Sequence, residues 1–179
     1  PPPEVIADLP PADVASVTIN GKDDGYPGSG SIYIQNRSKY DIDIPALLKA
    51  DDGVQLSGDD VQVLIMHTHG SEAYTPDPFN NYTPTDTDRT TDTNYNVVRV
   101  GDEIADILES RGIKTVHSRT LHDSPAYNGS YNRALEDITA YIKKYPSIKV
   151  VIDVHRDAMV AKNGTKYKTV CEIDGQKAA

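Results

Sequence analysis

The sequence predicts an α/β domain whose mostly parallel sheet is flanked by helices and preceded by a small N-terminal element containing β-strands. Two observations predict this class. From residue 61 onward, short apolar runs alternate with segments of helical period, an order that implies right-handed crossovers between parallel strands. Before residue 60, proline, glycine and aspartate are frequent and the β-rich runs are short. With 179 residues, the chain is long enough to bury a core without disulfides or metal.

The first 60 residues contain no pattern of reactive side chains. Residues 1–11 are rich in proline and predict an extended linker. Residues 17–19 and 31–34 are β-rich runs on either side of a glycine-rich stretch, which predicts a hairpin. Residues 42–50 predict a short helix. We interpret residues 1–60 as a linker followed by a small docking element.

The remaining residues carry the alternating pattern. Residues 61–66 form a near-continuous apolar run, as expected of a strand that is covered on both faces. Residues 97–111 and 130–145 repeat apolar side chains with helical spacing. The β-rich runs at residues 113–116 and 148–154 follow these helices and predict the second and third strands.

The end of the sequence predicts a hairpin and an incomplete fold. Asn163 and Gly164 form a turn signal before a β-rich run at residues 167–173. No closing helix follows, so we expect the C-terminal part of the fold to be missing. Residues 61–179 are therefore interpreted as one domain that is truncated at its C-terminus.

Composition excludes several classes of protein. A formal net charge of −9 is unlike a protein that binds nucleic acid through clustered lysine and arginine. The longest apolar run, residues 63–66, is far shorter than the ~20 residues that span a bilayer. A single cysteine excludes an internal disulfide.

Histidines follow two of the predicted strands. His67 and His69 come directly after the first strand, and His155 comes directly after the third. Because ligands bind at the carboxyl ends of parallel strands, we expect His69 and His155 to converge. Glu72 follows His69 with the spacing of one turn. Hydrolytic zinc sites use three His, Asp or Glu ligands, so the sequence predicts Zn²⁺ bound by His69, Glu72 and His155.

Other readings of these residues remain open. Glu72 could instead cap the turn while His69 donates to a backbone carbonyl. On an extended backbone His67 points away from His69, which disfavours it as a ligand. Structural roles are favoured for His117 and for His122 with its neighbour Asp123. Arg156, which follows His155, either anchors a substrate carboxylate or forms a local ion pair.

A long polar loop is predicted between the first strand and the first helix. Residues 76–96 lack a helical period, and loops of this length are usually functional or disordered. Its position places it at the rim of the predicted metal site. Tyr82 and Tyr95, with the charged residues of the loop, could contact a polar polymer. We expect the loop to serve binding of glycan or peptide rather than stability.

Four motifs together resemble a known family. They are HTHGSEAY at residues 67–74, NVVRVG at 96–101, HDSPAYNGSY at 122–131 and DVHRDA at 153–158. In this order they resemble the stage II sporulation protein P family, and the resemblance extends from Gln62 to the end of the chain. That family is similar to the zinc-dependent N-acetylmuramoyl-L-alanine amidases, which share an α/β fold.

The resemblance implies an activity and a cellular setting. It implies cleavage of the amide bond between the glycan lactyl group and the stem peptide of peptidoglycan, with possible endopeptidase activity on cross-links. It implies action outside the cytoplasm at the sporulation septum and engulfing membrane. Stage II sporulation proteins D and M are the implied partners, and a membrane anchor is expected upstream of this chain.

The resemblance also assigns residues. His69 and His155 match the two histidine ligands of the family, and Glu72 is our choice for the acidic ligand. The related amidases carry a catalytic glutamate on a late strand. Here only Glu172 follows His155, and it is poorly placed, so the general base is expected beyond residue 179. We therefore expect this chain to bind zinc yet hydrolyse peptidoglycan slowly.

Two alternatives to the amidase remain. A zinc carboxypeptidase would use the same His-x-x-Glu motif followed by a distant histidine. A non-catalytic domain that binds the cell wall as a scaffold would carry the same binding loop without the chemistry.

Overall fold

The computed structural model describes residues 15–18, 26–30, 32–74, 76, 81–86, 88–160, 162–163, 166–173 and 176–178. These residues fall into two compact units. One unit holds the described residues of 55–157, and the other holds those of 10–54 together with those of 158–179. The first unit carries the predicted metal site. Each unit is described by itself below.

The first unit is built on a parallel sheet of three strands. The strands are β4 (Val63–Met66), β5 (Thr115–His117) and β6 (Val150–Asp153), arranged in the order β5-β4-β6. All four residues of the central strand β4 are buried, which explains their uninterrupted apolar character. In the register of the sheet, Ile65 pairs with His117 and Met66 pairs with Asp153.

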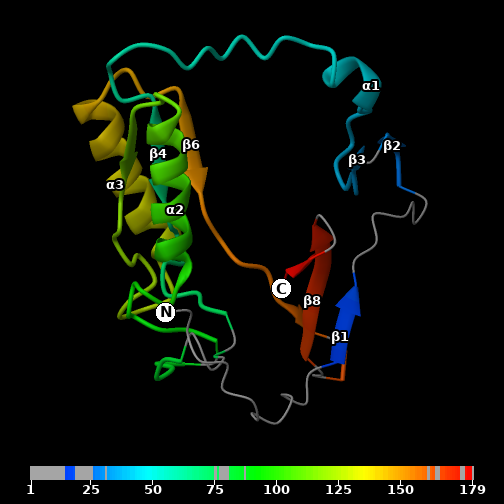
Figure 1. Cartoon of the computed structure of the whole chain (residues 1–179), viewed down its shortest axis with the longest axis vertical. Helices are drawn as coiled ribbons and strands as arrows, with labels where there is room; N and C mark the ends of the chain where they lie inside the picture. The colour runs from blue at the N-terminus through cyan, green and yellow to red at the C-terminus, as the bar shows by residue number, and fades with distance from the viewer. Residues whose placement is uncertain are drawn as a thin grey trace. The chain divides into compact units, whose positions relative to one another are not determined.

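Two helices cover this sheet. They are α2 (Val97–Ser110) and α3 (Ser130–Lys144), and both contact β4 (Figure 1). The chain crosses from β4 to β5 and then returns past β4 to β6. Right-handed crossovers in opposite directions place the two helices on opposite faces of the sheet. The side chain of Asn96 caps α2 by accepting a hydrogen bond from the backbone of Val98.

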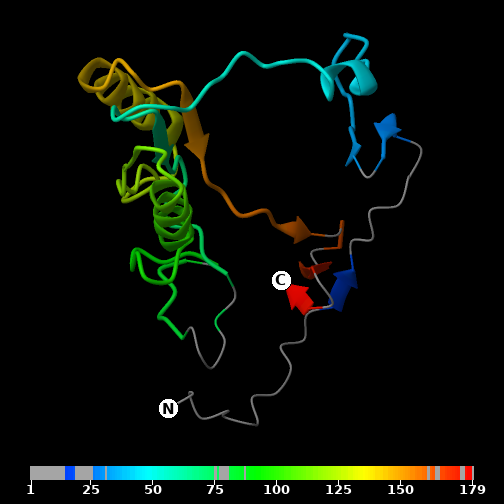
Figure 2. The same ribbon diagram turned by 45° about the horizontal axis from the view of Figure 1, so that its top comes forward.

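The second unit contains a mixed sheet and two smaller elements. The sheet consists of β1 (Ala15–Thr18), β7 (Met159–Val160), β8 (Lys166–Ile173) and β9 (Gln176–Ala178). Strand β8 pairs parallel with β1 and antiparallel with β7 and β9. A separate antiparallel pair, β2 (Gly28–Ser29) with β3 (Ile32–Tyr33), is followed by the short helix α1 (Ile44–Leu47). In Figure 2 the chain runs from β6 directly to β7.

The fold class predicted from the sequence is confirmed, and one predicted pairing is wrong. The hairpin between residues 17–19 and 31–34 does not form, because β1 pairs with β8 and β3 pairs with β2. Gly30, with a φ of 62°, allows the tighter turn between β2 and β3. The residues around β1 give no indication that its partner is β8, because β8 lies far along the sequence. The predicted hairpin around Asn163 agrees with the antiparallel pairing of β7 and β8; Gly164 lies outside the described residues.

The two units of the structure are not two consecutive stretches of sequence, and the predicted domain division at residue 60 stays a prediction. The first unit begins at Gln55, close to the predicted boundary at residue 60. Its described part ends at Asp157, and the described residues that follow belong with the N-terminal strands, because β8 pairs with β1. Within the described ranges, no helix has the length and apolar character needed to cross a membrane.

Candidate metal centre

The predicted ligands meet at one edge of the parallel sheet. His69 follows β4, His155 follows β6, and these two strands are hydrogen-bonded neighbours. The chain passes from β4 to β5 on one side of the sheet and then returns past β4 to β6 on the other side. The strand order therefore reverses between β4 and β6, the two strands that His69 and His155 follow. Ligand sites of open α/β sheets occur at that point. The parallel pairing of β4 with β6 therefore brings together two histidines that are far apart along the chain.

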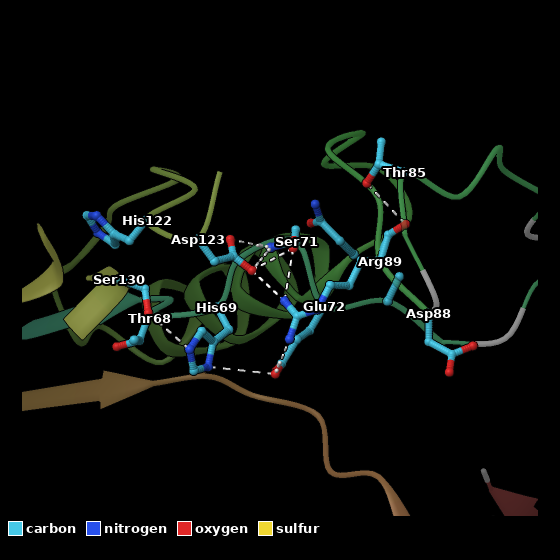
Figure 3. Close-up of polar contacts among 12 residues, drawn as sticks. Thr68, His69, Ser71, Glu72, Thr85, Asp88, Arg89, His122, Asp123 and Ser130 are labelled. Carbon is cyan, nitrogen blue, oxygen red and sulfur yellow. Dashed lines mark hydrogen bonds and ion pairs between the residues drawn. The ribbon is translucent and has the colours of Figure 1, made fainter. Parts of the chain in front are cut away.

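His69, Glu72 and His155 form a cluster that could hold a metal ion. One ligand atom from each residue lies within 4.8 Å of the others. The Nδ1 atom of His69 is 3.8 Å from Oε1 of Glu72, and the Nδ1 atom of His155 is 3.3 Å from Oε2 of the same carboxylate. Figure 3 shows the His69 ring facing the Glu72 carboxylate. A turn closed by the Glu72 N–H donating to the His69 carbonyl at 3.0 Å sets this spacing.

The opposite nitrogen of each imidazole has its own partner. Nε2 of His155 lies 3.0 Å from Oδ2 of Asp153, and Nε2 of His69 lies 3.1 Å from Oγ of Ser130. The His155 ring therefore lies between two carboxylates, with Nε2 beside Asp153 and Nδ1 beside Glu72. Metal-binding histidines are oriented by such outer contacts.

The electrostatics of the cluster favour the neutral imidazole of His69. Burial lowers the pKa of His69, and this outweighs the neighbouring Glu72 carboxylate, which acts in the opposite direction. Burial alone would raise the pKa of Asp153. Hydrogen bonds from the Thr68 side chain and backbone, together with His155, lower it further than burial raises it. A neutral imidazole beside ionised carboxylates is the protonation state that divalent metals bind.

Arg89 joins the long loop to this site. One of its guanidinium nitrogens lies 2.5 Å from Oδ2 of Asp123 and 3.0 Å from Oγ of Ser71, and the other lies 3.5 Å from Oε1 of Glu72. The Asp123 side chain is fully buried, so this ion pair neutralises a charge that would otherwise be costly to bury. Figure 3 shows the Arg89 side chain reaching towards both carboxylates. The Tyr127 ring stacks on His69 at 4.6 Å and contacts the same guanidinium.

His67 belongs to a different cluster, as its position two residues before His69 predicted. Its ring is fully buried, with Nδ1 3.1 Å from the Val154 carbonyl and Nε2 2.7 Å from Nε2 of His117. Nδ1 of His117 in turn lies 2.9 Å from the carboxylate of Asp102 on α2. Gly101 passes directly above the two rings, since a Cβ there would lie 2.6 Å from His117 and 2.7 Å from His67.

The remaining predicted residues take varied positions. Arg156 donates from its backbone to Glu72 at 3.1 Å and from its guanidinium to the carbonyls of Ala73 and Asp88 at 3.1 and 2.9 Å. It thus fastens the long loop to the strand ends, and its contact with substrate stays a prediction. Tyr82 and Tyr95 stack on each other within that loop, with ring centroids 5.9 Å apart.

Two other predicted residues lie away from the ligand cluster. His122 is buried, with Nε2 3.3 Å from the carboxylate of Asp137, in keeping with the structural role that the sequence favoured. Glu172 lies in β8, outside the unit that contains the cluster. The general base therefore stays a prediction.

Sequence reasoning missed the partners of the two histidines. Asp153 lies within the predicted strand at residues 148–154, and its spacing to His155 places both side chains on one side of an extended backbone. That period was a usable signal. Ser130 has no comparable signal, because its approach to His69 depends on how α3 packs against β4.

Comparison with known proteins places the chain in a family. A family described as Stage II sporulation protein P (SpoIIP) matches residues 16–179. Stage II sporulation protein P of Bacillus subtilis (strain 168) is 29% identical over 136 residues, which cover 69% of this chain and 33% of that protein. The chain thus spans about a third of the length of this curated relative. No solved structure matches the chain. The chain belongs to the stage II sporulation protein P family.

Proposed function

We propose that this chain is the metal-binding part of a peptidoglycan hydrolase, a zinc-dependent N-acetylmuramoyl-L-alanine amidase that acts during sporulation. The observation that carries the proposal is the cluster of His69, Glu72 and His155 at the edge of the sheet. Membership of a sporulation family supports the setting. The polar loop that Arg89 and Arg156 fasten beside the cluster supports a polar polymer as the substrate.

The residues of the cluster fit a zinc ion. Two imidazoles and one carboxylate are the ligand set of many hydrolytic zinc sites, which leave one position open. Nδ1 of His69 and Nδ1 of His155 lie 3.8 and 3.3 Å from the two oxygens of Glu72. Donor atoms that gather this closely can all be ligands of one ion, so the arrangement of the chain's own atoms supports a metal here.

Each surrounding residue has a distinct task in this proposal. Bound zinc supplies a Lewis acid that polarises the scissile carbonyl and lowers the pKa of a water molecule towards ~7. Asp153 and Ser130 hold the two imidazoles in their orientation. Arg89 keeps Asp123 neutralised and limits how far the Glu72 carboxylate can turn.

The carboxylates near the cluster already have partners. Glu72 faces both histidines, Asp123 pairs with Arg89, and Asp153 accepts from Thr68 and His155. None of these three is poised to take a proton from water. We therefore retain the expectation of a glutamate base outside residues 1–179. A positioned base typically contributes about 10² to 10⁴ to the rate.

The cellular setting belongs to the same proposal. We place the whole protein outside the cytoplasm, anchored in the membrane at the sporulation septum through a segment upstream of this chain. Stage II sporulation proteins D and M are the proposed partners, and peptidoglycan is the proposed substrate.

Release of stem peptides from purified sacculi tests the activity. The chain and a longer version are compared at equal zinc occupancy, with and without chelator, alongside His69→Ala versions of both. The proposal expects chelator-sensitive release of peptides with a free N-terminal alanine, faster with the longer version and lost in His69→Ala. Release of single C-terminal amino acids would instead identify a carboxypeptidase. Retention on sacculi without any cleavage by either version would identify a wall-binding scaffold.

A further inference from the structure

Residues of the long loop line an open pocket that the metal site does not use. Its volume is about 460 Å³, and its lining includes Asn81, Tyr82, Thr83, Thr91, Asp92 and Tyr95. A cavity of this size falls in the range that holds small ligands.

Two tyrosines provide an aromatic wall that is held in place. The rings of Tyr82 and Tyr95 are 5.9 Å apart at an angle of 26°, and both line the pocket. The Tyr82 hydroxyl donates to the Tyr74 carbonyl at 2.6 Å, which fixes the direction of that ring. The face of an aromatic ring carries partial negative charge and attracts the polarised C–H groups of a bound ligand.

Several other side chains of the lining offer hydrogen bonds that the protein does not use itself. Within the described part of the chain, the side chains of Asn81, Thr83 and Thr91 have no hydrogen-bond partner. Asp92 uses one carboxylate oxygen, Oδ1, to accept from the backbone and side chain of Asn94 at 3.0 and 2.8 Å. Hydroxyl, amide and carboxylate groups therefore surround an aromatic wall. This combination suits a ligand that has C–H groups on one face and hydroxyl or amide groups at its edge.

The charge of the lining selects among such ligands. Asp92 is the one charged residue in the described lining, and no lysine or arginine contributes to it. A phosphate or a carboxylate-bearing peptide would be repelled there, within a chain of net charge −9. A neutral ring with hydroxyl and acetamido groups meets no such penalty.

We propose that this pocket binds an N-acetylated amino sugar of a glycan strand. The inference rests on the proposed function, and it assigns the glycan rather than the peptide to the loop. Thr90, at the pocket, donates from its backbone N–H to the Ser71 carbonyl at 2.8 Å, and Ser71 precedes Glu72. One backbone hydrogen bond therefore links the lining of the pocket to the residue that precedes Glu72. In muramoyl-alanine the sugar ring is separated from the scissile carbonyl only by the lactyl ether, so the two sites must be neighbours.

Titration with tetra-N-acetylchitotetraose, an uncharged sugar that contains no peptide, tests the pocket. Binding to the full 179-residue chain is followed by calorimetry and by NMR. Tyr95→Ala should weaken binding at least about tenfold, whereas Tyr95→Phe should retain it, because the ring face rather than the hydroxyl makes the contact. Tyr40→Ala, at a tyrosine that is 68% exposed in the other unit, is the matched control and should leave binding unchanged.

A metal-site variant separates this inference from the proposed activity. His69→Ala should abolish zinc binding and keep sugar binding. Failure of the hydrolysis assay would therefore not contradict the assignment of the pocket. Equal affinities of the wild type and a folded Tyr95→Ala variant would overturn the inference. Absence of sugar binding at millimolar probe, or preferential binding of a free stem peptide that Tyr95→Ala weakens, would also overturn it. Thermal unfolding of each variant checks that it is folded.

Discussion

Two histidine clusters lie on either side of the end of β4, and they are built for different purposes. In the first cluster, His69 and His155 both face the Glu72 carboxylate with Nδ1, while their Nε2 atoms contact residues outside it. In the second, His67 and His117 face each other at 2.7 Å beneath Gly101. The nitrogens of the first cluster converge on a common carboxylate, whereas the Nε2 atoms of the second pair with each other.

The contrast teaches that the number of histidines and carboxylates near a strand end does not define a metal site. Both clusters contain two imidazoles and one carboxylate. What differs is whether the nitrogens converge on one point or pair with one another. Because side chains alternate along an extended backbone, residues 67 and 69 are directed to opposite sides and enter different clusters.

The largest expected effect is loss of the metal from the converging cluster. His69→Ala and His155→Ala should each abolish stoichiometric zinc, since each removes one of three protein ligands. His117→Asn, in the paired cluster, is the matched control and should retain zinc. Elemental analysis of the purified variants measures this. Stoichiometric zinc in both alanine variants would refute the site.

Acidification should destabilise the fold through His67 of the paired cluster. Burial, with a smaller contribution from His117, lowers the pKa of His67 from 6.5 to about 4, although the Val154 carbonyl and the Asp153 and Asp102 carboxylates oppose this. The unfolded chain therefore binds more protons between pH 6.5 and about 4, and stability falls as the pH falls through this window. His67 alone accounts for up to roughly 3 kcal/mol over that range.

Urea unfolding of the metal-free chain at a series of pH values measures this loss. The contribution of His67 to the free energy of unfolding should be nearly constant above pH 7. It should decline as the pH falls below 6.5, the pKa of an unperturbed histidine. A flat profile down to pH 5 would contradict the burial of a neutral His67.

Filling the space above the paired rings should destabilise the fold without affecting the metal. In Gly101→Ala the added Cβ would lie 2.6 Å from Nε2 of His117, so helix or rings must shift. Overpacking of this kind costs about 1–3 kcal/mol. Asp106→Ala, at an exposed position of the same helix, serves as the control. Unchanged stability in Gly101→Ala would show that α2 does not pack closely on the rings.

The smallest expected effect concerns an outer contact of the converging cluster. Ser130→Ala removes the hydroxyl that lies 3.1 Å from Nε2 of His69 and leaves the ring free to turn. Zinc affinity should fall by about tenfold, the lower end of the effect of such partners. Competition with a chromogenic chelator measures it. An unchanged affinity would mean that Tyr127 stacking alone orients His69.

The convergence of His69, Glu72 and His155 could be predicted from the sequence because it follows from the order of the parallel strands. A buried apolar run followed by His-x-x-Glu, and a second β-rich run followed by His155, place their side chains at one edge of any parallel sheet. The pairing of β1 with β8 could not be predicted in this way, since neither strand is adjacent in sequence to the other. The contact between Arg89 and Asp123 was equally hidden, because it depends on the path of an irregular loop.

The clamp formed by Arg156 has a mechanical consequence. The chain leaves the first unit directly after Asp157, so His155 of the candidate metal cluster lies two residues before the end of this unit. Arg156 lies between them, and its backbone and guanidinium hold Glu72, Ala73 and Asp88. We therefore expect a pull on the connecting segment to load the hydrogen bonds of Arg156 before it moves the His155 ring.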